Sequence, residues 1–312
     1  MPRDGPLGSH VMLVLLPRAI SGISLPDGFR SIVFDAQRQE LDGTTREAEF
    51  YVPAYMGDSR IFEVIAEMPK LRYVQLLTAG IDKTVGYIPD GVTLMNARGV
   101  HDSSTAELAL ALTLASMRNL TGFIRAGSQA WSARAGRPSL YAKQVAIVGA
   151  GSIGHEIARV FGALGARSTL ISRTGRDGTL RLADSGGLLA NADVVVLVVP
   201  LTEATRHMAD ASFLANLKDG ALFVNVARGE VADTAALLAE VSSGRIQAAL
   251  DVTDPEPLPT DHPLWNEPNC LISPHVGGAT DAFIPKAREL VEKNLARIAN
   301  GEQPLNIIDG EY

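Results

Sequence analysis

The chain has 312 residues, of which 46% are hydrophobic, and this predicts one large or two medium globular domains with a buried core. A net charge of −7 and a sequence pI of about 5.4 give no electrostatic basis for binding nucleic acid or an anionic membrane. The single cysteine, Cys270, excludes an intrachain disulfide and favours the reducing cytoplasm, and no apolar run approaches the roughly 20 residues that span a bilayer.

The first hundred residues alternate short apolar runs with helical patterns. Residues 1–10 contain GPLGSH, which resembles a cloning remnant, and are excluded from the predicted fold. Residues 60–68 have apolar side chains at helical spacing, and this helix is expected to stop before Pro69. Strands are expected at residues 11–16, 31–34, 49–52, 71–77 and 92–95.

The pattern changes after residue 103. Residues 105–118 are rich in Ala and Leu and predict a buried helix, with Ser103 or Ser104 as its N-cap. A last helix, residues 282–300, is expected to cross back and pack on the first domain. Further strands, several of them β-branched runs typical of a parallel sheet covered on both faces, are expected at residues 145–148, 168–171, 194–199, 221–226, 247–251 and 270–273.

These elements predict an α/β protein of two domains. Residues 104–279 are expected to form a Rossmann-type, doubly wound parallel sheet that binds a dinucleotide. Residues 11–103 together with 280–312 are expected to form a smaller, flavodoxin-like α/β domain, to which the resemblance described below assigns the substrate.

A glycine pattern marks the predicted cofactor site. Gly149, Gly151 and Gly154 follow a strand and open a helix, where they allow a tight turn, backbone approach to a pyrophosphate and close helix packing. Backbone N–H groups here, including those of Ser152 and Ile153, then face the anion. The alternative is a glycine-rich turn without a ligand.

The end of the next strand selects the cofactor. Ser172 stands near the position where NAD enzymes place an acidic residue that binds the ribose. Arg173, Thr174 and Arg176 follow, and Arg173 can hold a 2′-phosphate with charge-assisted bonds worth about 1.5–3 kcal/mol. We therefore expect NADP(H) to be preferred, with NAD(H) possible. The alternative is that these arginines are solvated loop charges.

Three residues in the last third of the chain have the chemistry to reduce a 2-keto acid. Arg228 follows a strand, and its guanidinium fork fits a carboxylate and the adjacent carbonyl. His275 also follows a strand, and imidazole can donate a proton near neutral pH. Glu256 can contact this imidazole, favour its protonated form and fix its orientation. No metal is expected.

The chain resembles the D-isomer-specific 2-hydroxyacid dehydrogenase family, especially its glyoxylate/hydroxypyruvate reductase branch. The resemblance is strongest in LKDGALFVNVARGEVAD (residues 217–233), HPLWNEPN (262–269) and PHVGG (274–278). It implies that Arg228 binds substrate, that Glu256 pairs with His275, and that His275 exchanges the proton.

The resemblance also implies contacts beyond these three residues. Asp251 would contact the nicotinamide carboxamide, and the loop of Thr78, Ala79 and Gly80 would bind the substrate carboxylate. A homodimer formed through the helix after Ser104 is implied as well. Further cofactor contacts are implied at Val199, Pro200, Leu201, Thr202, Thr205, Ala227, His275 and Gly277.

The predicted function is NADPH-dependent reduction of a small 2-keto acid to the D-2-hydroxy acid. Tyr55 and Met56 are predicted to cap the substrate cleft, as are Tyr51 and Trp265, although packing within their own domain is equally compatible with the sequence. The alternatives are another oxidoreductase on the same scaffold, acting on phosphite or a branched-chain 2-keto acid, and a nucleotide-sensing, corepressor-like binding protein.

Overall fold

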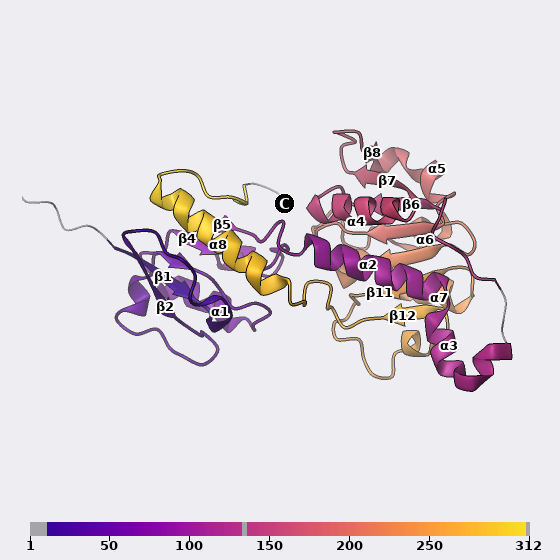
Figure 1. Cartoon of the computed structure of the whole chain (residues 1–312), viewed down its shortest axis with the longest axis horizontal. Helices are drawn as coiled ribbons and strands as arrows, with labels where there is room; N and C mark the ends of the chain where they lie inside the picture. Colours follow the sequence, from indigo (N-terminus) through magenta and orange to yellow (C-terminus); the bar gives the residue numbers. More distant parts are fainter. Residues whose placement is uncertain (1–10, 133–135, 310–312) are drawn as a thin grey trace, which may run out of the picture. The chain divides into compact units, whose positions relative to one another are not determined.

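The computed structural model describes residues 11–132 and 136–309, so the cloning remnant predicted at residues 1–10 lies outside the described residues. The chain divides into two compact units (Figure 1). The first unit contains residues 11–101 and 281–309, and the second contains residues 102–132 and 136–280. The polypeptide therefore passes twice between the units, between residues 101 and 102 and between residues 280 and 281.

The sheet of the first unit is entirely parallel, with strand order β2-β1-β3-β4-β5. This is the flavodoxin-like order, so the predicted class of the smaller domain is confirmed. Its strands are β1 (Met12–Leu16), β2 (Phe29–Val33), β3 (Phe50–Tyr51), β4 (Tyr73–Gln75) and β5 (Thr93–Met95).

The two faces of this sheet have different helical covers because side chains alternate along a strand. Leu13 and Leu15 of β1 belong to the core that includes α1 (Arg60–Glu63) and the 3₁₀ helix η3 (Val64–Glu67). Met12, Val14 and Leu16 belong to the core that includes Phe283, Ala287, Leu290, Val291 and Leu295 of α8 (Phe283–Ala299). The last helix thus covers one face of the first sheet, as expected from the sequence (Figure 1).

The second sheet is also parallel, with strand order β12-β11-β10-β9-β6-β7-β8. The order reverses between β6 and β9, which is the switch point where Rossmann-type sheets bind dinucleotides. The strands are β6 (Gln144–Val148), β7 (Arg167–Ser172), β8 (Leu180–Arg181), β9 (Val194–Leu197), β10 (Leu222–Asn225), β11 (Gln247–Leu250) and β12 (Cys270–Ile272).

Helices cover both faces of the second sheet, which confirms the doubly wound fold. Val145 and Ile147 of β6 pack with α2 (Asp102–Met117) and α4 (Ser152–Ala163). The other face, which includes Ala146 and Val148, packs with α5 (Gly186–Leu189), α6 (Ala211–Ala215) and α7 (Thr234–Ser242). The remaining helices are α3 (Leu120–Ala126) and the 3₁₀ helices η1 (Arg18–Ile20), η2 (Thr45–Glu47), η4 (Val85–Tyr87), η5 (Gly127–Ser132), η6 (Leu182–Asp184), η7 (Gly229–Val231) and η8 (Pro263–Asn266).

Several local predictions were wrong. Neither Ser103 nor Ser104 caps α2, because the helix already begins at Asp102, whose acidic side chain suits the positive helix end, and the Ser104 hydroxyl bonds Thr280 Oγ1 at 2.7 Å. The helix predicted at residues 60–68 tightens to 3₁₀ geometry after Glu63. Strand β8 was missed, since two residues are too few for a periodic pattern.

No helix within residues 11–132 and 136–309 is long and apolar enough to cross a membrane.

Candidate active site

The predicted cofactor and catalytic residues of the second unit all follow the carboxyl ends of its strands. Because these strands are parallel, their carboxyl ends lie at one edge of the sheet. The predicted residues lie at positions 149–154 after β6, 172–176 at the end of β7, 199–205 after β9, 227–228 after β10, 251 and 256 after β11 and 275–277 after β12.

The glycine turn after β6 fits a pyrophosphate. Gly149 has φ +123°, and a Cβ there would lie 2.4 Å from the Val198 carbonyl oxygen. A Cβ on Gly154 would lie 2.0 Å from the Gly149 carbonyl oxygen, so the first turn of α4 needs this glycine to approach β6. A Cβ on Gly151 would meet nothing within 4 Å. The turn therefore leaves open space beside Gly151, where α4 presents the positive end of its dipole together with Ser152 and Ile153.

The arginines after β7 are positioned at the surface. Arg173, Thr174 and Arg176 are exposed, and Ser172 is half-buried. Within residues 11–132 and 136–309, no carboxylate forms an ion pair with Arg173 or Arg176. These two guanidinium groups are therefore accessible to an anionic ligand.

A buried asparagine shapes the turn that carries Arg228. Asn225, 1% exposed, donates its side-chain N–H to the Arg228 carbonyl oxygen at 2.9 Å and accepts from the Ala227 N–H at 3.0 Å. The half-buried Arg228 guanidinium donates to the Ala227 carbonyl oxygen at 2.8 Å. The turn after β10 is thus fixed from within the sheet before any ligand binds.

Gly229 holds this turn against the loop after β11. A Cβ on Gly229 would lie 1.9 Å from the Thr253 carbonyl oxygen and 2.7 Å from the Asp254 amide nitrogen, so only glycine fits. The Thr234 hydroxyl donates to the Asp254 carbonyl oxygen at 2.7 Å and adds a second link. The loop that carries Glu256 is therefore fixed relative to the turn that carries Arg228.

The structure brings Glu256 and His275 together. His275 Nδ1 lies 2.7 Å from Glu256 Oε1, and the two side chains are 28% and 38% exposed. A carboxylate accepts here, so Nδ1 carries the hydrogen and donates it. The other ring nitrogen, Nε2, is then left to exchange a proton with a ligand.

Asp251 holds the turn that presents His275. The Asp251 side chain is buried, and its Oδ1 accepts from the Ser273 hydroxyl at 2.6 Å and the Val276 N–H at 2.9 Å, while Oδ2 accepts from the Gly277 N–H at 2.8 Å. The His275 N–H donates to the Asp251 carbonyl oxygen at 2.7 Å, and His275 adopts the left-handed region with φ +54°. The sequence assigned Asp251 to the nicotinamide and missed this positioning role, for which an Asp at a strand end before a Ser-Pro-His turn was the available signal.

The remaining cofactor residues lie in the turn after β9. The Thr205 hydroxyl donates to the Pro200 carbonyl oxygen at 2.6 Å and accepts from the Thr202 N–H at 2.8 Å. Pro200 is exposed, while Val199 and Leu201 are half-buried. Thr205 therefore shapes this turn with its hydroxyl and leaves Pro200 at the surface.

The predicted substrate loop belongs to the first unit. Thr78 donates its hydroxyl to the Gly80 carbonyl oxygen at 2.8 Å. The fully buried Asn96 donates its side-chain N–H to the Ala79 carbonyl oxygen at 2.8 Å. Asn96 was not predicted as a site residue, but it holds this loop in shape.

The aromatic residues predicted at the cleft have structural contacts. Tyr51 is 1% exposed and donates its hydroxyl to the Ile61 carbonyl oxygen at 3.0 Å, so of the two roles that the sequence left open for Tyr51 the structure shows packing within its own domain. The half-buried Tyr55 packs on Phe283, with ring centroids 4.3 Å apart, while Met56 is 59% exposed. Trp265 donates its indole N–H to the Pro259 carbonyl oxygen at 2.8 Å, which ties it to its own loop.

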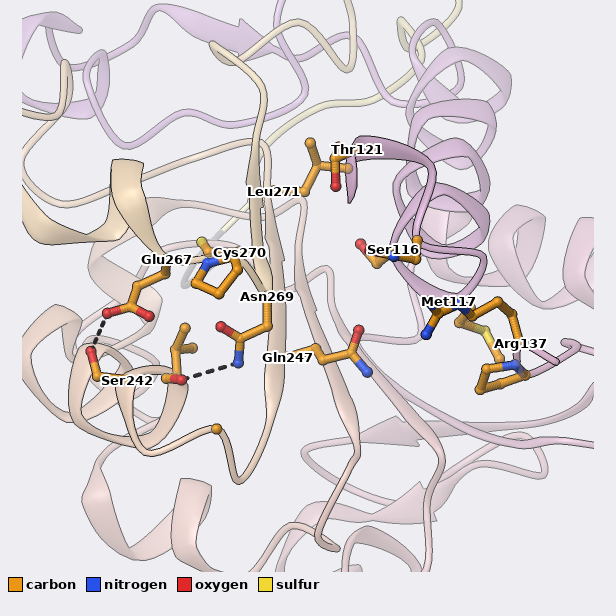
Figure 2. A pocket seen from close by; sticks show the side chains of 15 residues that line it. Ser116, Met117, Thr121, Arg137, Ser242, Gln247, Glu267, Asn269, Cys270 and Leu271 are labelled. Carbon is orange, nitrogen blue, oxygen red and sulfur yellow. Dashed lines mark hydrogen bonds between the residues drawn. The ribbon is translucent and has the colours of Figure 1, made fainter. Parts of the chain in front are cut away.

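A pocket of about 470 Å³ lies at the opposite edge of the second sheet, near the amino ends of β11 and β12 (Figure 2). Gln247 and Asn269 lie between Glu267 on one side and Arg137 on the other. Cys270 also lines it, and burial raises the pKa of its thiol to about 12, so this thiol is poorly reactive. In the described part of the chain, none of the residues predicted to bind substrate or cofactor lines this pocket.

No group of His, Cys, Asp and Glu side chains suited to a metal ion occurs within residues 11–132 and 136–309.

Comparisons with known proteins agree on one family. Residues 110–277 match the model of the D-isomer specific 2-hydroxyacid dehydrogenase NAD binding domain. The chain is 34% identical to glyoxylate reductase from Pyrococcus horikoshii, over 80% of this chain and 79% of that protein. It is 33% identical to human glyoxylate reductase/hydroxypyruvate reductase, over 78% of each chain.

Solved structures give the same result. A D-isomer specific 2-hydroxyacid dehydrogenase family protein from Aeromonas salmonicida aligns with a TM-score of 0.83 and 27% identity, covering 97% of this chain and 100% of that one. A D-isomer specific 2-hydroxyacid dehydrogenase from Xanthobacter autotrophicus, in complex with NADPH and MES, aligns with a TM-score of 0.77 and 30% identity, covering 96% of this chain and 98% of that one.

Proposed function

Because this chain belongs to the D-isomer-specific 2-hydroxyacid dehydrogenase family and is an NAD(P)-dependent oxidoreductase, we propose that it uses NADPH to reduce a small 2-keto acid, such as glyoxylate or hydroxypyruvate, to the D-2-hydroxy acid. The observation that carries the proposal is the hydrogen bond between His275 and Glu256, formed at the sheet edge that also carries Arg228 and the glycine turn.

The proposed chemistry assigns one task to each group. NADPH, when bound at the glycine turn, supplies the hydride that adds to C2 of the substrate. Arg228 binds the substrate carboxylate and polarises the carbonyl oxygen, which gains negative charge as the hydride arrives. His275 donates the proton on Nε2 to that oxygen, while Glu256 accepts Nδ1–H and fixes the orientation of the imidazole. In the reverse reaction, neutral His275 accepts the proton from the hydroxy acid.

The preference for NADPH is supported by the turn after β7. Ser172 leaves the strand end without a carboxylate, and Arg173 and Arg176 are exposed beside it. A 2′-phosphate there would gain charge-assisted bonds worth about 1.5–3 kcal/mol. The Xanthobacter relative, which is similar to this chain over almost its whole length, is described with NADPH.

A substrate panel run with both cofactors tests the proposed function. We expect glyoxylate or hydroxypyruvate to oxidise NADPH, with kcat/KM at least about tenfold higher than with NADH. The measurement is the loss of absorbance of the reduced nicotinamide. Turnover only with phosphite and an oxidised cofactor, or only with branched-chain 2-keto acids, would replace the proposed substrate. Cofactor binding without turnover of any panel member would favour the nucleotide-sensing function.

We propose that the protein is a homodimer and that the segment after α2 forms the contact. Most of α2 is covered by its own unit, but α3 and η5, which follow it, expose Leu120 (48%), Ile124 (79%) and Trp131 (75%). Exposed apolar groups of this size favour burial against a partner. Light scattering is expected to give twice the 33.1 kDa chain mass for the wild type and a smaller value for Ile124→Glu. A wild-type mass of one chain would contradict the proposal.

A further inference from the structure

A chain of hydrogen bonds runs through the turn between β7 and β8. Ser172 Oγ accepts from the Gly175 N–H at 2.9 Å and lies 2.6 Å from Thr179 Oγ1. The Thr179 hydroxyl donates to the Arg176 carbonyl oxygen at 2.6 Å, and the Thr179 N–H donates to the same oxygen at 3.1 Å. We call this set of bonds the Ser172–Thr179 relay.

The number of hydroxyl hydrogens determines which group donates and which accepts in each bond of the relay. A carbonyl oxygen can only accept, so Thr179 must use its single hydroxyl hydrogen toward Arg176. The Thr179 oxygen must then accept, so the hydrogen between the two hydroxyls comes from Ser172. Both hydroxyl hydrogens are therefore used inside the turn. Ser172 has none left to donate to a phosphate oxygen while the relay is intact.

The relay fixes the backbone at Gly175 and Arg176, within the turn that carries the two arginines. One end holds the amide of Gly175, which has φ +68° and where a Cβ would lie 2.9 Å from Arg181 Cβ. The other end holds the carbonyl group of Arg176. Arg173, Thr174 and Arg176 stay exposed on this fixed turn. A turn held before binding loses less conformational freedom when an anion arrives.

We infer that Thr179 and Ser172 are positioning residues that select NADPH over NADH, by shaping the turn that binds the 2′-phosphate, and that Ser172 does not contact the phosphate itself. This inference rests on the proposed cofactor preference. The direct contacts then come from Arg173, Thr174 and Arg176. The sequence placed Ser172 among the cofactor ligands, and the relay gives its hydroxyl a different task.

Calorimetric binding of adenosine 2′,5′-bisphosphate, with ADP as the reference ligand without a 2′-phosphate, tests the inference on the full-length protein. Thr179→Val keeps the shape of the side chain but removes the hydroxyl. We expect it to weaken adenosine 2′,5′-bisphosphate binding about 3- to 10-fold and to leave ADP binding unchanged. Thr179→Ser keeps the hydroxyl and should bind like the wild type. Arg173→Ala, which removes a direct contact, should lose about 10- to 100-fold.

A double-mutant cycle separates a relay from two direct contacts. In a relay, Ser172→Ala and Thr179→Val each interrupt the same series of hydrogen bonds. The double variant should therefore bind adenosine 2′,5′-bisphosphate no more weakly than the single variant with the lower affinity. Additive losses would overturn the inference, as would equal losses for both nucleotides or wild-type affinity in Thr179→Val. If Thr179→Val does not fold, Thr179→Ala takes its place, and a selective loss in Thr179→Ala with none in Thr179→Ser is then required.

The outcomes also distinguish the inference from the proposed function. If Arg173→Ala loses selectivity and Thr179→Val does not, the NADPH proposal stands and the inference falls. If no 2-keto acid is reduced but selective nucleotide binding still depends on Thr179, the proposed reaction falls and the inference stands. If the wild type binds both nucleotides equally, the inference and the cofactor preference both fall.

Discussion

Replacing His275 with Asn is expected to lower kcat/KM for the 2-keto acid by about 10²–10⁴-fold, the usual contribution of a general acid. Asn tolerates the left-handed backbone that His275 adopts at φ +54°, so the turn held by Asp251 should survive. The glycine turn belongs to a different strand end, so NADPH should still bind. Steady-state kinetics and fluorescence titration of NADPH measure the two effects separately.

His262→Asn is the matched control for this prediction. His262 accepts the Leu264 N–H through Nδ1 at the start of η8, and an Asn oxygen can accept the same bond. This control should keep turnover within about twofold of the wild type, because it removes an imidazole that plays no part in the proposed chemistry. A turnover in His275→Asn as high as in the control would remove His275 from the mechanism.

The second large effect is expected from Arg228→Ala. The guanidinium fork can make two charge-assisted bonds to the substrate, each worth about 1.5–3 kcal/mol, so kcat/KM should fall on the order of 10²–10⁴-fold. Arg228→Lys keeps the charge but loses the fork, and it should recover only part of the loss. Added guanidinium ion should partly restore turnover in Arg228→Ala. Kinetics with the best substrate of the panel measures all three effects.

Arg206→Ala controls for the loss of one positive charge from the same unit. Arg206 is half-exposed and pairs with Glu230 in a surface ion pair, which contributes about 0–1 kcal/mol. Its removal should leave kcat/KM within about twofold of the wild type. A fall in Arg206→Ala comparable to that in Arg228→Ala would mean that general electrostatic attraction of the anionic substrate, and not a specific fork, explains the role of Arg228.

Much of the fold could be predicted because its signals are local. The β-branched runs of the second unit and the glycine turn at Gly149, Gly151 and Gly154 are contiguous in sequence, and their placement follows from parallel pairing. Strand β8 could not be predicted, since Leu180 and Arg181 form a strand only by pairing with Ile171 and Ser172. The change from α to 3₁₀ geometry after Glu63 was not predicted from the sequence either.

The site residues could be named from their chemistry, but their supporting contacts could not. The bond between Glu256 and His275 was expected because a carboxylate and an imidazole suit one another. The contact of Gly229 with Thr253 depends on how two loops approach in space, and a sequence pattern has no access to that distance. The task of Thr179 is equally invisible, because the direction of a hydroxyl chain follows from geometry and proton count.

The helix α8 has a consequence for how the protein is made. It supplies Phe283, Ala287, Leu290, Val291 and Leu295 to the core beneath the first sheet, but the ribosome produces it only after the whole second unit. The strands of the first unit are synthesised first. One apolar face of their sheet therefore stays uncovered during translation, while residues 102–280 emerge from the ribosome. During this interval the nascent first unit is open to chaperones and to aggregation, and it is completed last although its synthesis begins first.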